Sequence, residues 1–458
     1  MSLSETSYLV FLAAAAVLYW AFAATGRRVA GVLVLLSLVF YGTWNVLYCI
    51  PLLITAATDF LVAIALEYTF DLPRRRLLVG VSLAVDLGIL AFFKYLGFFG
   101  VHSLPFRIVM MAGISFYTFQ SLSYVLDVYQ RNQAATHSFV EYLAFVSFFP
   151  TLLAGPITRA ETLFPQLRRQ AQSIDPDLMA EGFFLIALGF VKKCVIADYL
   201  AESIVNRVFD QPLFFSSAEV LTGVYAYAAQ IYCDFSGYSD IAIGSALLLG
   251  IRLKDNFKSP YRASDLAEFW KRWHISLSTW LQDYLYFSLP GKRVPAMRYV
   301  NVIVTFALAG LWHGASWTFV IWGCLHGAGQ AIHRGFSALW PAGRTPARWR
   351  VIAGTFVTFH FVVFAWIFFR CDTLAQARDV LGKLGDLSTG AANISLPVIA
   401  ATLAAIVLQF APDNWLTRVR CAFVMQPAVA QAMLLVLCAM VVRWIGGAQV
   451  SPFIYQRF

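Results

Sequence analysis

The sequence predicts an all-α, polytopic membrane protein, and its composition and the length of its apolar runs carry that prediction. Of the 458 residues, 60% are hydrophobic and only 13% are charged, whereas soluble domains carry about 25% charged residues. The apolar residues form continuous runs, many of them near the roughly 20 residues that a spanning helix needs. A β-barrel would instead alternate in polarity over segments of about 10 residues. We therefore expect about 11 spanning helices, with the shorter apolar runs forming re-entrant or interfacial helices.

The first three apolar runs set the expected orientation. They cover residues 8–24, 29–48 and 51–68. Basic residues follow the first run at 27–28 and the third at 74–76. Two runs separate these clusters, so both fall on one side, which the positive-inside rule makes cytoplasmic. No basic residue precedes the first run, unlike in a secretory signal peptide, so we expect a retained helix with its N-terminus outside.

Composition also limits the domain organisation and the classes of ligand. No polar connection is long enough for a soluble domain of about 50 residues, which predicts a single membrane-embedded domain over residues 1–458, with a motif core at about 113–333. The net charge of +9 lies in short loops beside apolar runs, so we expect no nucleic-acid partner. The seven cysteines are scattered without a Cys-x-x-Cys pair. Neither a zinc ribbon nor a disulfide framework is therefore expected.

Residues 256–326 concentrate aromatic and charged side chains within this apolar chain, where polar groups are costly and become functional candidates. If residues 265–285 form one helix, Trp273 shares a face with Trp280, and His274 lies at its flank. Glu268 and Arg272 are then spaced to pair. Two interpretations stay open, an interfacial helix with an ordinary histidine and a helix that lines a tunnel.

His313 follows an apolar run and stands between Trp312 and Gly314. At membrane depth an imidazole is held neutral, because burial disfavours its charged form, and a neutral imidazole can serve as a general base. The alternative is a packing histidine bonded to a backbone carbonyl. Gly310, like Gly314, allows close backbone approach or a break in the helix.

His326 and His333 lie seven residues apart on one helical face, and Gly323 and Gly327 form a small-x-x-x-small packing step on the same segment. Helix packing is the better interpretation there, since zinc-ligand spacing is missing and no metal site is expected.

Acidic and basic residues also interrupt the apolar runs between 190 and 250. Asp234 and Asp240 could pair with a cation such as Arg272, or cap a helix broken near Gly237. Lys192 and Lys193 are expected to snorkel to the interface. No nucleophile elbow, Walker loop or dinucleotide fingerprint occurs, so direct base-assisted transfer fits an enzyme better than a covalent intermediate.

Taken together, short motifs along most of the chain resemble the membrane-bound O-acyltransferase family, and most closely its alginate O-acetylation branch. The branch that serves D-alanyl transfer is a more distant resemblance. The motifs that carry the resemblance are Phe93-Lys94-Tyr95, residues 113–120, 148–150 and 154–157, residues 234–240 and 256–280, Leu311-Trp312-His313-Gly314, and Trp366 with Phe369-Arg370.

The resemblance implies a funnel-shaped helical domain with a central tunnel, in a bacterial inner membrane, with the N-terminus periplasmic. It implies that His313 is catalytic, and that His274, 313 − 274 = 39 residues earlier, is the second family histidine. Lining residues would be Trp312, Gly314, Trp273, Arg272, Asn256, Asp240 and Tyr238.

The implied reaction moves an acetyl group from a cytoplasmic donor, acetyl-CoA, across the membrane for O-acetylation of an exported polysaccharide such as alginate. The implied partners are membrane lipid and a periplasmic acetyltransferase of the SGNH type or another acyl-accepting protein, with no bound cofactor. Three alternatives remain: transfer of a longer acyl or aminoacyl group to a lipid, protein or teichoic acid; a transporter; and a scaffold of an export complex. Matching halves with broken helices, common in transporters, are not found in the sequence.

Overall fold

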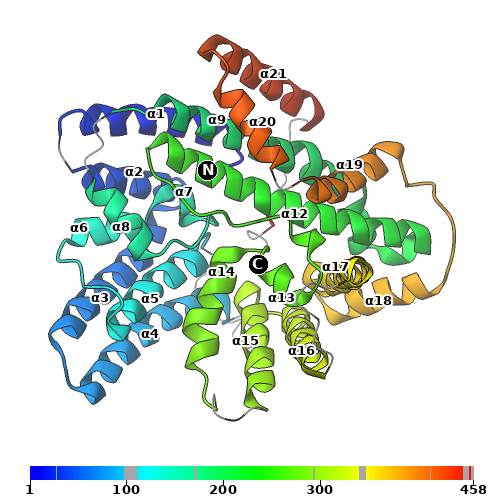
Figure 1. Cartoon of the computed structure of the whole chain (residues 1–458), viewed down its shortest axis with the longest axis horizontal. Coiled ribbons are helices and arrows are strands. Elements are labelled where there is room, and N and C mark those ends of the chain that lie inside the picture. The colour runs from blue at the N-terminus through cyan, green and yellow to red at the C-terminus, as the bar shows by residue number, and fades with distance from the viewer. Residues whose placement is uncertain are drawn as a thin grey trace. The chain divides into compact units, whose positions relative to one another are not determined.

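The computed structural model describes residues 1–26, 28–96, 111–169, 173–291, 294, 296–339, 347–412, 414–446 and 453–454. Every regular element within these residues is a helix, which confirms the predicted all-α class (Figure 1). The chain divides into two compact units, each built from segments far apart in the sequence. Helices α9, α12, α20 and α21 contribute residues to both units. The single-domain prediction stays a prediction.

Unit 1 comprises Met1–Leu188, Tyr238–Asp255 and Arg420–Leu435. Its own elements are α1 (Thr6–Ala23), α2 (Ala30–Gly42), η1 (Val46–Tyr48), α3 (Cys49–Tyr68), α4 (Leu72–Lys94), α5 (Ile114–Gln130), α6 (Phe139–Val146), α7 (Phe149–Leu152) and α8 (Ala160–Arg168). The elements shared with the other unit are α9 (Pro176–Phe190), α12 (Ser217–Leu248), α20 (Trp415–Val424) and α21 (Ala428–Gly446).

Unit 2 comprises Gly189–Gly237, Asn256–Val419 and Val436–Phe458. Its first elements are η2 (Val191–Ala197), α10 (Asp198–Leu200), η3 (Ala201–Val205), α11 (Asn206–Asp210) and η4 (Pro212–Phe214). After α12 come η5 (Pro260–Arg262), α13 (Leu266–Trp270), α14 (Ile275–Trp280), η6 (Leu281–Leu285), η7 (Tyr286–Ser288), α15 (Met297–His313), α16 (Trp317–Leu339), α17 (Arg348–Arg370), α18 (Leu374–Gly385), α19 (Leu396–Val407) and η8 (Leu408–Phe410). Three of these, η2, η3 and η6, are π-helices, whose wide turns recur at functional sites.

Helices α3, α4 and α5 pack against one another in unit 1 and lie side by side in Figure 1. Arg75, one of the residues expected in a cytoplasmic basic loop, is instead buried here. Its guanidinium donates to the carbonyl oxygens of Thr69 at 2.8 Å and Tyr129 at 2.6 Å. Helix C-termini leave carbonyl oxygens unsatisfied and favour cations, so Arg75 ties the ends of α3 and α5 together. Arg27 lies outside the described residues.

Helices α15 and α16 form a closely packed hairpin in unit 2, visible side by side in Figure 1. A β-carbon at Gly323 would collide with the carbonyl oxygen of Phe306, and one at Gly310 would collide with that of Phe319. Glycine at these crossing points lets the two backbones approach, as the sequence predicted. This approach fixes the position of the C-terminal end of α15, where His313 lies.

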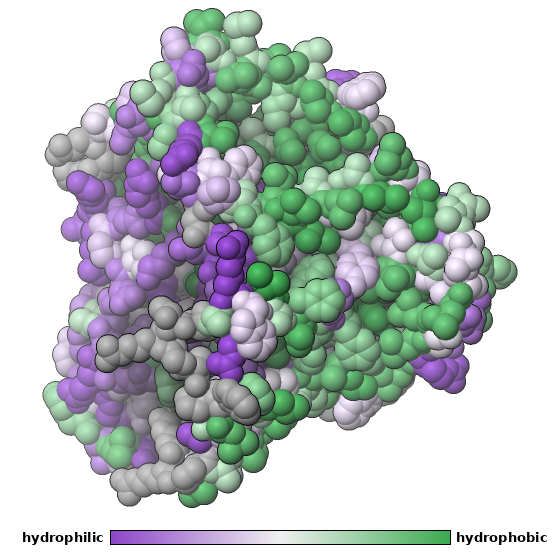
Figure 2. Space-filling model, turned by 45° about the vertical axis from the view of Figure 1, so that its right-hand side comes forward, coloured by the Kyte–Doolittle hydropathy of each residue, from purple (hydrophilic) through white to green (hydrophobic). Residues whose placement is uncertain are grey.

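Five helices of the described residues are long and apolar enough to cross a membrane, or six if the bent pair Leu396–Phe410 and Trp415–Val424 counts as one span. Large apolar side chains are exposed on them, and Figure 2 shows hydrophobic residues over much of one face of the molecule. The chain is therefore a membrane protein. Helices such as α12 and α16 are long but do not meet the same apolar criterion, and both carry buried polar residues. The expected count of about 11 spans stays a prediction.

Candidate active site

The segment 265–285 is not the single helix that the sequence analysis considered. Asp265 caps helix α13, because its carboxylate accepts the backbone N–H of Glu268 at 2.8 Å, and the helix ends at Trp270. The chain then turns, and His274 has left-handed dihedral angles, φ 43° and ψ 56°. A non-glycine residue in that region cannot continue a right-handed helix. Trp273 and Trp280 therefore lie on opposite sides of a break and share no helical face.

The side chain of Asn256 holds His274 in this turn. Asn256 Oδ1 accepts the backbone N–H of Ser276 at 3.2 Å and its hydroxyl at 2.9 Å. Because a backbone N–H can only donate, the Asn256 atom facing this turn is the oxygen. The same oxygen lies 3.3 Å from His274 Nδ1. Nδ1 must then carry the proton, and the lone pair of the neutral ring lies on Nε2.

The His274 ring is completely buried. Burial lowers the pKa of the His274 imidazole to about 3, because the charged form loses its hydration. The ring packs edge-to-face with that of Phe235, with the two ring centroids 4.7 Å apart. His274 is therefore a neutral hydrogen-bond acceptor at physiological pH.

His313 is the last residue of α15 and is also buried, with 3% of its surface exposed. Its ring centroid lies 4.9 Å from Trp312, 5.1 Å from Trp322 and 5.2 Å from Phe369. The Trp312 ring lies 6.4 Å from that of His274. The two histidines, which are distant in sequence, therefore belong to one buried aromatic cluster in unit 2.

Gly314 follows with extended dihedral angles, and a β-carbon there would collide with the ring of Phe319. Trp273 belongs to the same aromatic cluster, because its ring lies 5.0 Å from Trp366 and 5.7 Å from Phe269. Trp366 in turn stacks on Trp322 at 5.8 Å.

Arg272 pairs with Glu268 at 2.7 Å, as the spacing predicted, and donates to the Lys258 carbonyl at 3.1 Å. Of the nine predicted site residues, seven therefore lie in unit 2: His274, His313, Trp312, Gly314, Trp273, Arg272 and Asn256. Tyr238 and Asp240 belong to the part of α12 assigned to unit 1.

A buried charge cluster beside this site contradicts two predictions. Lys193 does not snorkel: it is 1% exposed, and its ammonium lies 2.7 Å from both Asp198 and Asp234. Asp234 therefore pairs with Lys193 and not with Arg272. Helix α12 also runs unbroken through Gly237. Sequence reasoning missed this cluster, although a lysine inside an apolar run was a signal for it.

The cluster is linked to His274 through the next residue of α12. Phe235 contacts the His274 ring, and its neighbour Asp234 accepts the backbone N–H of Ile454 at 2.8 Å. Residues 453–454 are thereby tied to the same turn of α12, and Phe453 lies 5.8 Å from Phe235, ring to ring. The ion pair of Lys193 with Asp234 thereby holds in place the neighbouring Phe235, which contacts His274.

His326 supports the packing interpretation. It is completely buried, and its Nδ1 accepts the indole N–H of Trp270 at 3.3 Å, which joins α16 to α13. Within the described residues, no three His, Cys, Asp or Glu side chains lie close enough together to hold a metal ion.

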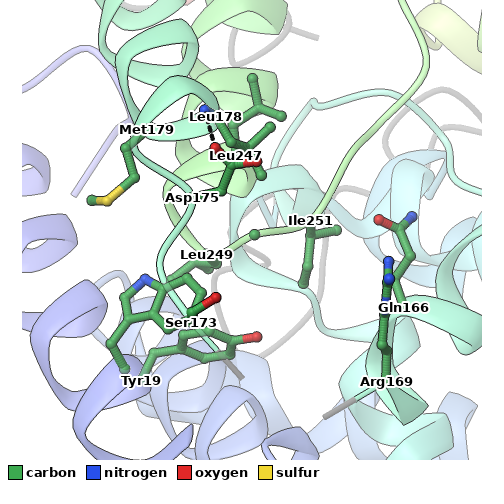
Figure 3. Close-up of a pocket in the computed structure, with 12 residues that line it drawn as sticks. Tyr19, Gln166, Arg169, Ser173, Asp175, Leu178, Met179, Leu247, Leu249 and Ile251 are labelled. Carbon is green, nitrogen blue, oxygen red and sulfur yellow. Dashed lines mark hydrogen bonds between the residues drawn. The ribbon is translucent and has the colours of Figure 1, made fainter. Parts of the chain in front are cut away.

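A separate cavity of about 700 Å³ lies within unit 1 (Figure 3). The end of α1, the segments around α8 and α9 and the end of α12 line it, with Arg169, Gln166 and Asp175 as polar side chains. Asp175 accepts the Leu178 backbone N–H at 3.2 Å there. None of the predicted site residues lines this cavity.

The fold and the site together describe an all-helical membrane protein that buries two histidines among tryptophans. The sequence profile of the membrane-bound O-acyltransferase family matches residues 131–372, which include both histidines. The chain belongs to this family and is an acyltransferase.

The similar proteins act on different acceptors. A probable alginate O-acetylase, AlgI, of Pseudomonas aeruginosa is 40% identical in an alignment over 417 residues that covers 84% of this chain and 77% of that protein. A peptidoglycan O-acetyltransferase of Helicobacter pylori is 36% identical over 77% of this chain and 73% of its own length. A teichoic acid D-alanyltransferase of Bacillus subtilis is 28% identical over 58% of this chain and 70% of its own length.

Proposed function

We propose that this chain moves an acetyl group from cytoplasmic acetyl-CoA across the bacterial inner membrane for O-acetylation of an exported polysaccharide such as alginate. His313 is the catalytic base in this proposal. The acetyl group passes through a tunnel in a single membrane-embedded domain to an acyl-accepting partner, a periplasmic acetyltransferase of the SGNH type. The N-terminus lies in the periplasm.

The chemistry requires a base for the acceptor hydroxyl and surroundings that exclude water. Attack of the hydroxyl oxygen on the thioester carbonyl forms the ester bond, breaks the C–S bond and releases the CoA thiol. His313 takes the proton of the attacking hydroxyl and returns it to the leaving thiolate. The aromatic walls around His313 keep water from competing as the nucleophile.

In the proposal, His274 orients the acceptor or relays its proton. Because Asn256 accepts the Nδ1–H, the lone pair on Nε2 is the one that can accept a hydrogen bond from a hydroxyl group. The single observation that carries the proposal is that His274 and His313 belong to one buried aromatic cluster, joined through Trp312. The O-acetylase names of two relatives support acetyl as the group transferred.

The test is the acetyl-ester content of exported polysaccharide in cells that carry the wild type, His313→Ala or His274→Ala at matched membrane levels. We expect ester content to fall about 100-fold or more for His313→Ala, the range of general base catalysis. His333→Ala, a half-buried histidine on α16, is the matched control and should leave esters unchanged. Normal ester content with His313→Ala would exclude the assignment.

The same cells decide the acceptor, because one relative is named for peptidoglycan. Esters confined to peptidoglycan would replace the exported polysaccharide with the cell wall as acceptor. Membranes supplied with acetyl-CoA or longer acyl-CoA donors then determine which acyl group is transferred.

A further inference from the structure

The cavity of unit 1 in Figure 3 is separate from the proposed reaction, because none of the predicted site residues lines it. Its volume of about 700 Å³ lies within the range of small-molecule sites, about 300–1,000 Å³. The residues that line it all belong to unit 1, so its shape is set within one compact unit. What the cavity can bind follows from its depth in the membrane and from the groups on its walls.

The cavity lies at one end of a membrane-spanning helix. Helix α1 is long and apolar enough to cross a membrane, and Tyr19 and Trp20, near its C-terminal end, line the cavity. The indole N–H of Trp20 donates to the carbonyl oxygen of Leu248 at 2.8 Å, which fixes this end of α1 against the end of α12. Tyrosine and tryptophan concentrate at the membrane–water interface. These features place the cavity at the depth of the lipid head groups.

One end of the cavity is apolar. Leu178 and Met179 from α9 and Leu247 from α12 lie there, and Figure 3 shows them well separated from Arg169 and Gln166. Leu178 and Leu247 belong to one buried hydrophobic cluster. An acyl chain that enters this end leaves water and packs against a hydrophobic wall, which is favourable in proportion to the apolar area that is buried.

Two polar side chains of the cavity are engaged within the protein. The Gln166 amide accepts the backbone N–H of Arg252 at 2.8 Å and donates to the Arg252 carbonyl at 2.9 Å. Asp175 Oδ1 accepts the backbone N–H of Asp177 at 3.0 Å and that of Leu178 at 3.2 Å, at the start of α9. Both side chains therefore have structural roles in shaping the cavity.

Arg169, which directly follows α8, differs from the arginines near it. Arg168 pairs with Glu141 at 2.6 Å, and Arg252 pairs with Glu181 at 3.3 Å. Arg169 is exposed, and no carboxylate of the described residues lies within ion-pair distance of its guanidinium. An arginine fork can bond two oxygens of a phosphate group at once. The cavity thus offers an uncompensated cation at one end and an apolar wall at the other.

We propose that this cavity binds one anionic phospholipid, with its phosphate group on Arg169 and an acyl chain along Leu178, Met179 and Leu247. A lipid fits better than CoA, because CoA brings several phosphate charges to a single arginine and has no long apolar part for the opposite wall. A lipid in this position contacts α1, α9 and α12 together. Its binding therefore stabilises the packing of these three helices, independently of acyl transfer.

The experiment is thermal unfolding of the purified full-length protein in detergent, followed by tryptophan fluorescence. Phosphatidylglycerol and phosphatidylcholine with identical acyl chains are titrated into the micelles, and CoA and inorganic phosphate are added in separate samples. We expect a saturable rise in Tm, because a ligand that binds only the folded state stabilises it. Half-saturation should need about fivefold less phosphatidylglycerol than phosphatidylcholine, the effect of one basic residue on an anionic lipid. CoA and phosphate should leave the Tm unchanged.

Two variants test the two ends of the cavity. Arg169→Gln should raise the half-saturating amount of phosphatidylglycerol about fivefold, to that of phosphatidylcholine. Arg76→Gln is the matched control, because Arg76 is also an exposed arginine of unit 1, on the spanning helix α4, and does not line the cavity. It should keep the wild-type preference. Met179→Trp places a larger side chain in the apolar end and should abolish the saturable response to both lipids.

If Met179→Trp does not fold, the comparison of Arg169→Gln with Arg76→Gln decides the matter. Equal half-saturation of the two lipids in the wild type, or an equal effect of the two arginine substitutions, would show only unspecific lipid around the protein. A rise in Tm with CoA or phosphate that Arg169→Gln removes would identify a water-soluble phosphate ligand instead. Any of these results, or a wild-type Tm that no lipid changes, would overturn the proposal.

Discussion

Two pairs of aspartates are buried in this chain, and burial makes a negative charge costly in both. The groups that surround the two pairs differ. Asp198 and Asp234 in unit 2 have the ammonium of Lys193 at 2.7 Å from each. Asp59 and Asp86 in unit 1 have hydroxyl groups around them and no basic side chain in an ion pair among the described residues. The first pair is compensated by the chain itself, whatever the solution. The second has no such counter-charge in the described part of the chain, and hydroxyl donors and a contact between its two carboxyl groups hold it, so the two pairs should respond differently to substitution.

The largest effect should come from removing the counter-ion of unit 2. Lys193→Met leaves two buried aspartates without compensation, and breaking a buried ion pair in this way costs about 3–5 kcal/mol. We expect a lower Tm and a lower membrane level, measured by fluorescence unfolding and quantitative blotting. Lys192→Met is the control, since Lys192 lies over the Tyr232 ring at 5.8 Å and is only half-buried. Equal effects of the two substitutions would contradict the assigned role of Lys193.

Neutralising the whole cluster should then recover most of that loss. Lys193→Met combined with Asp198→Asn and Asp234→Asn removes all three charges together, and replacing a buried ion cluster by neutral groups is often nearly neutral in stability. The asparagine that replaces Asp234 would keep a side-chain oxygen to accept the Ile454 N–H. The measurement is the Tm of the triple variant against Lys193→Met alone. A triple variant less stable than the single one would show that geometry, and not charge, dominates.

The two aspartates of unit 1 should differ from each other. Asp59→Ala leaves the Ser82 and Ser121 hydroxyls without their acceptor and should cost about 1–3 kcal/mol. Asp86→Asn replaces a carboxyl group, whose partners are Asp59 and Thr55, by a neutral amide that can still donate to Asp59, and it should cost less than about 1 kcal/mol. Urea or thermal unfolding measures both. The reverse order would mean that Asp86 is the ionised member.

The smallest effect at neutral pH is expected from a substitution that adds an acidic group beside His274. Asn256→Asp places a carboxylate 3.3 Å from His274 Nδ1, if the turn keeps its geometry. The carboxylate favours imidazolium and raises the His274 pKa above the wild-type value of about 3. Below the new pKa, the neutral fraction falls about tenfold per pH unit. Acetyl transfer should fall at a higher pH than in the wild type, and identical pH–rate profiles would separate His274 from the reaction.

Much of this architecture could be predicted because its causes are local in sequence. Apolar runs gave the helical membrane class, the Glu268–Arg272 spacing gave an ion pair, and Gly323 gave a close helix contact. The break at His274 could not be predicted from periodicity, since Asn256, eighteen residues away, holds that turn. The snorkelling predicted for Lys193 was wrong for a physical reason. Asp234 is distant from Lys193 along the chain, and Asp198 lies one π-helical turn after it, so the three side chains meet only in the folded unit.

The site residues show the same difference between features that are local in the sequence and contacts that form only on folding. The motif around His313 was visible because Trp312 and Gly314 are its chain neighbours. The contacts of His313 with Trp322 and Phe369 come from two further helices and appear only on folding. Phe235, which faces His274, was missed because a phenylalanine in an apolar run carries no signal of its own.

The fluorescence of the tryptophans around the two histidines reports on changes within the site. Trp312 and Trp322 are in ring contact with His313, and Trp273 and Trp366 continue the cluster, out of 13 tryptophans in the chain. A thioester or hydroxyl that reaches His313 must change the polarity seen by at least one of these indoles. Stopped-flow emission can therefore time the arrival of a donor separately from the appearance of the ester, without any label attached to either.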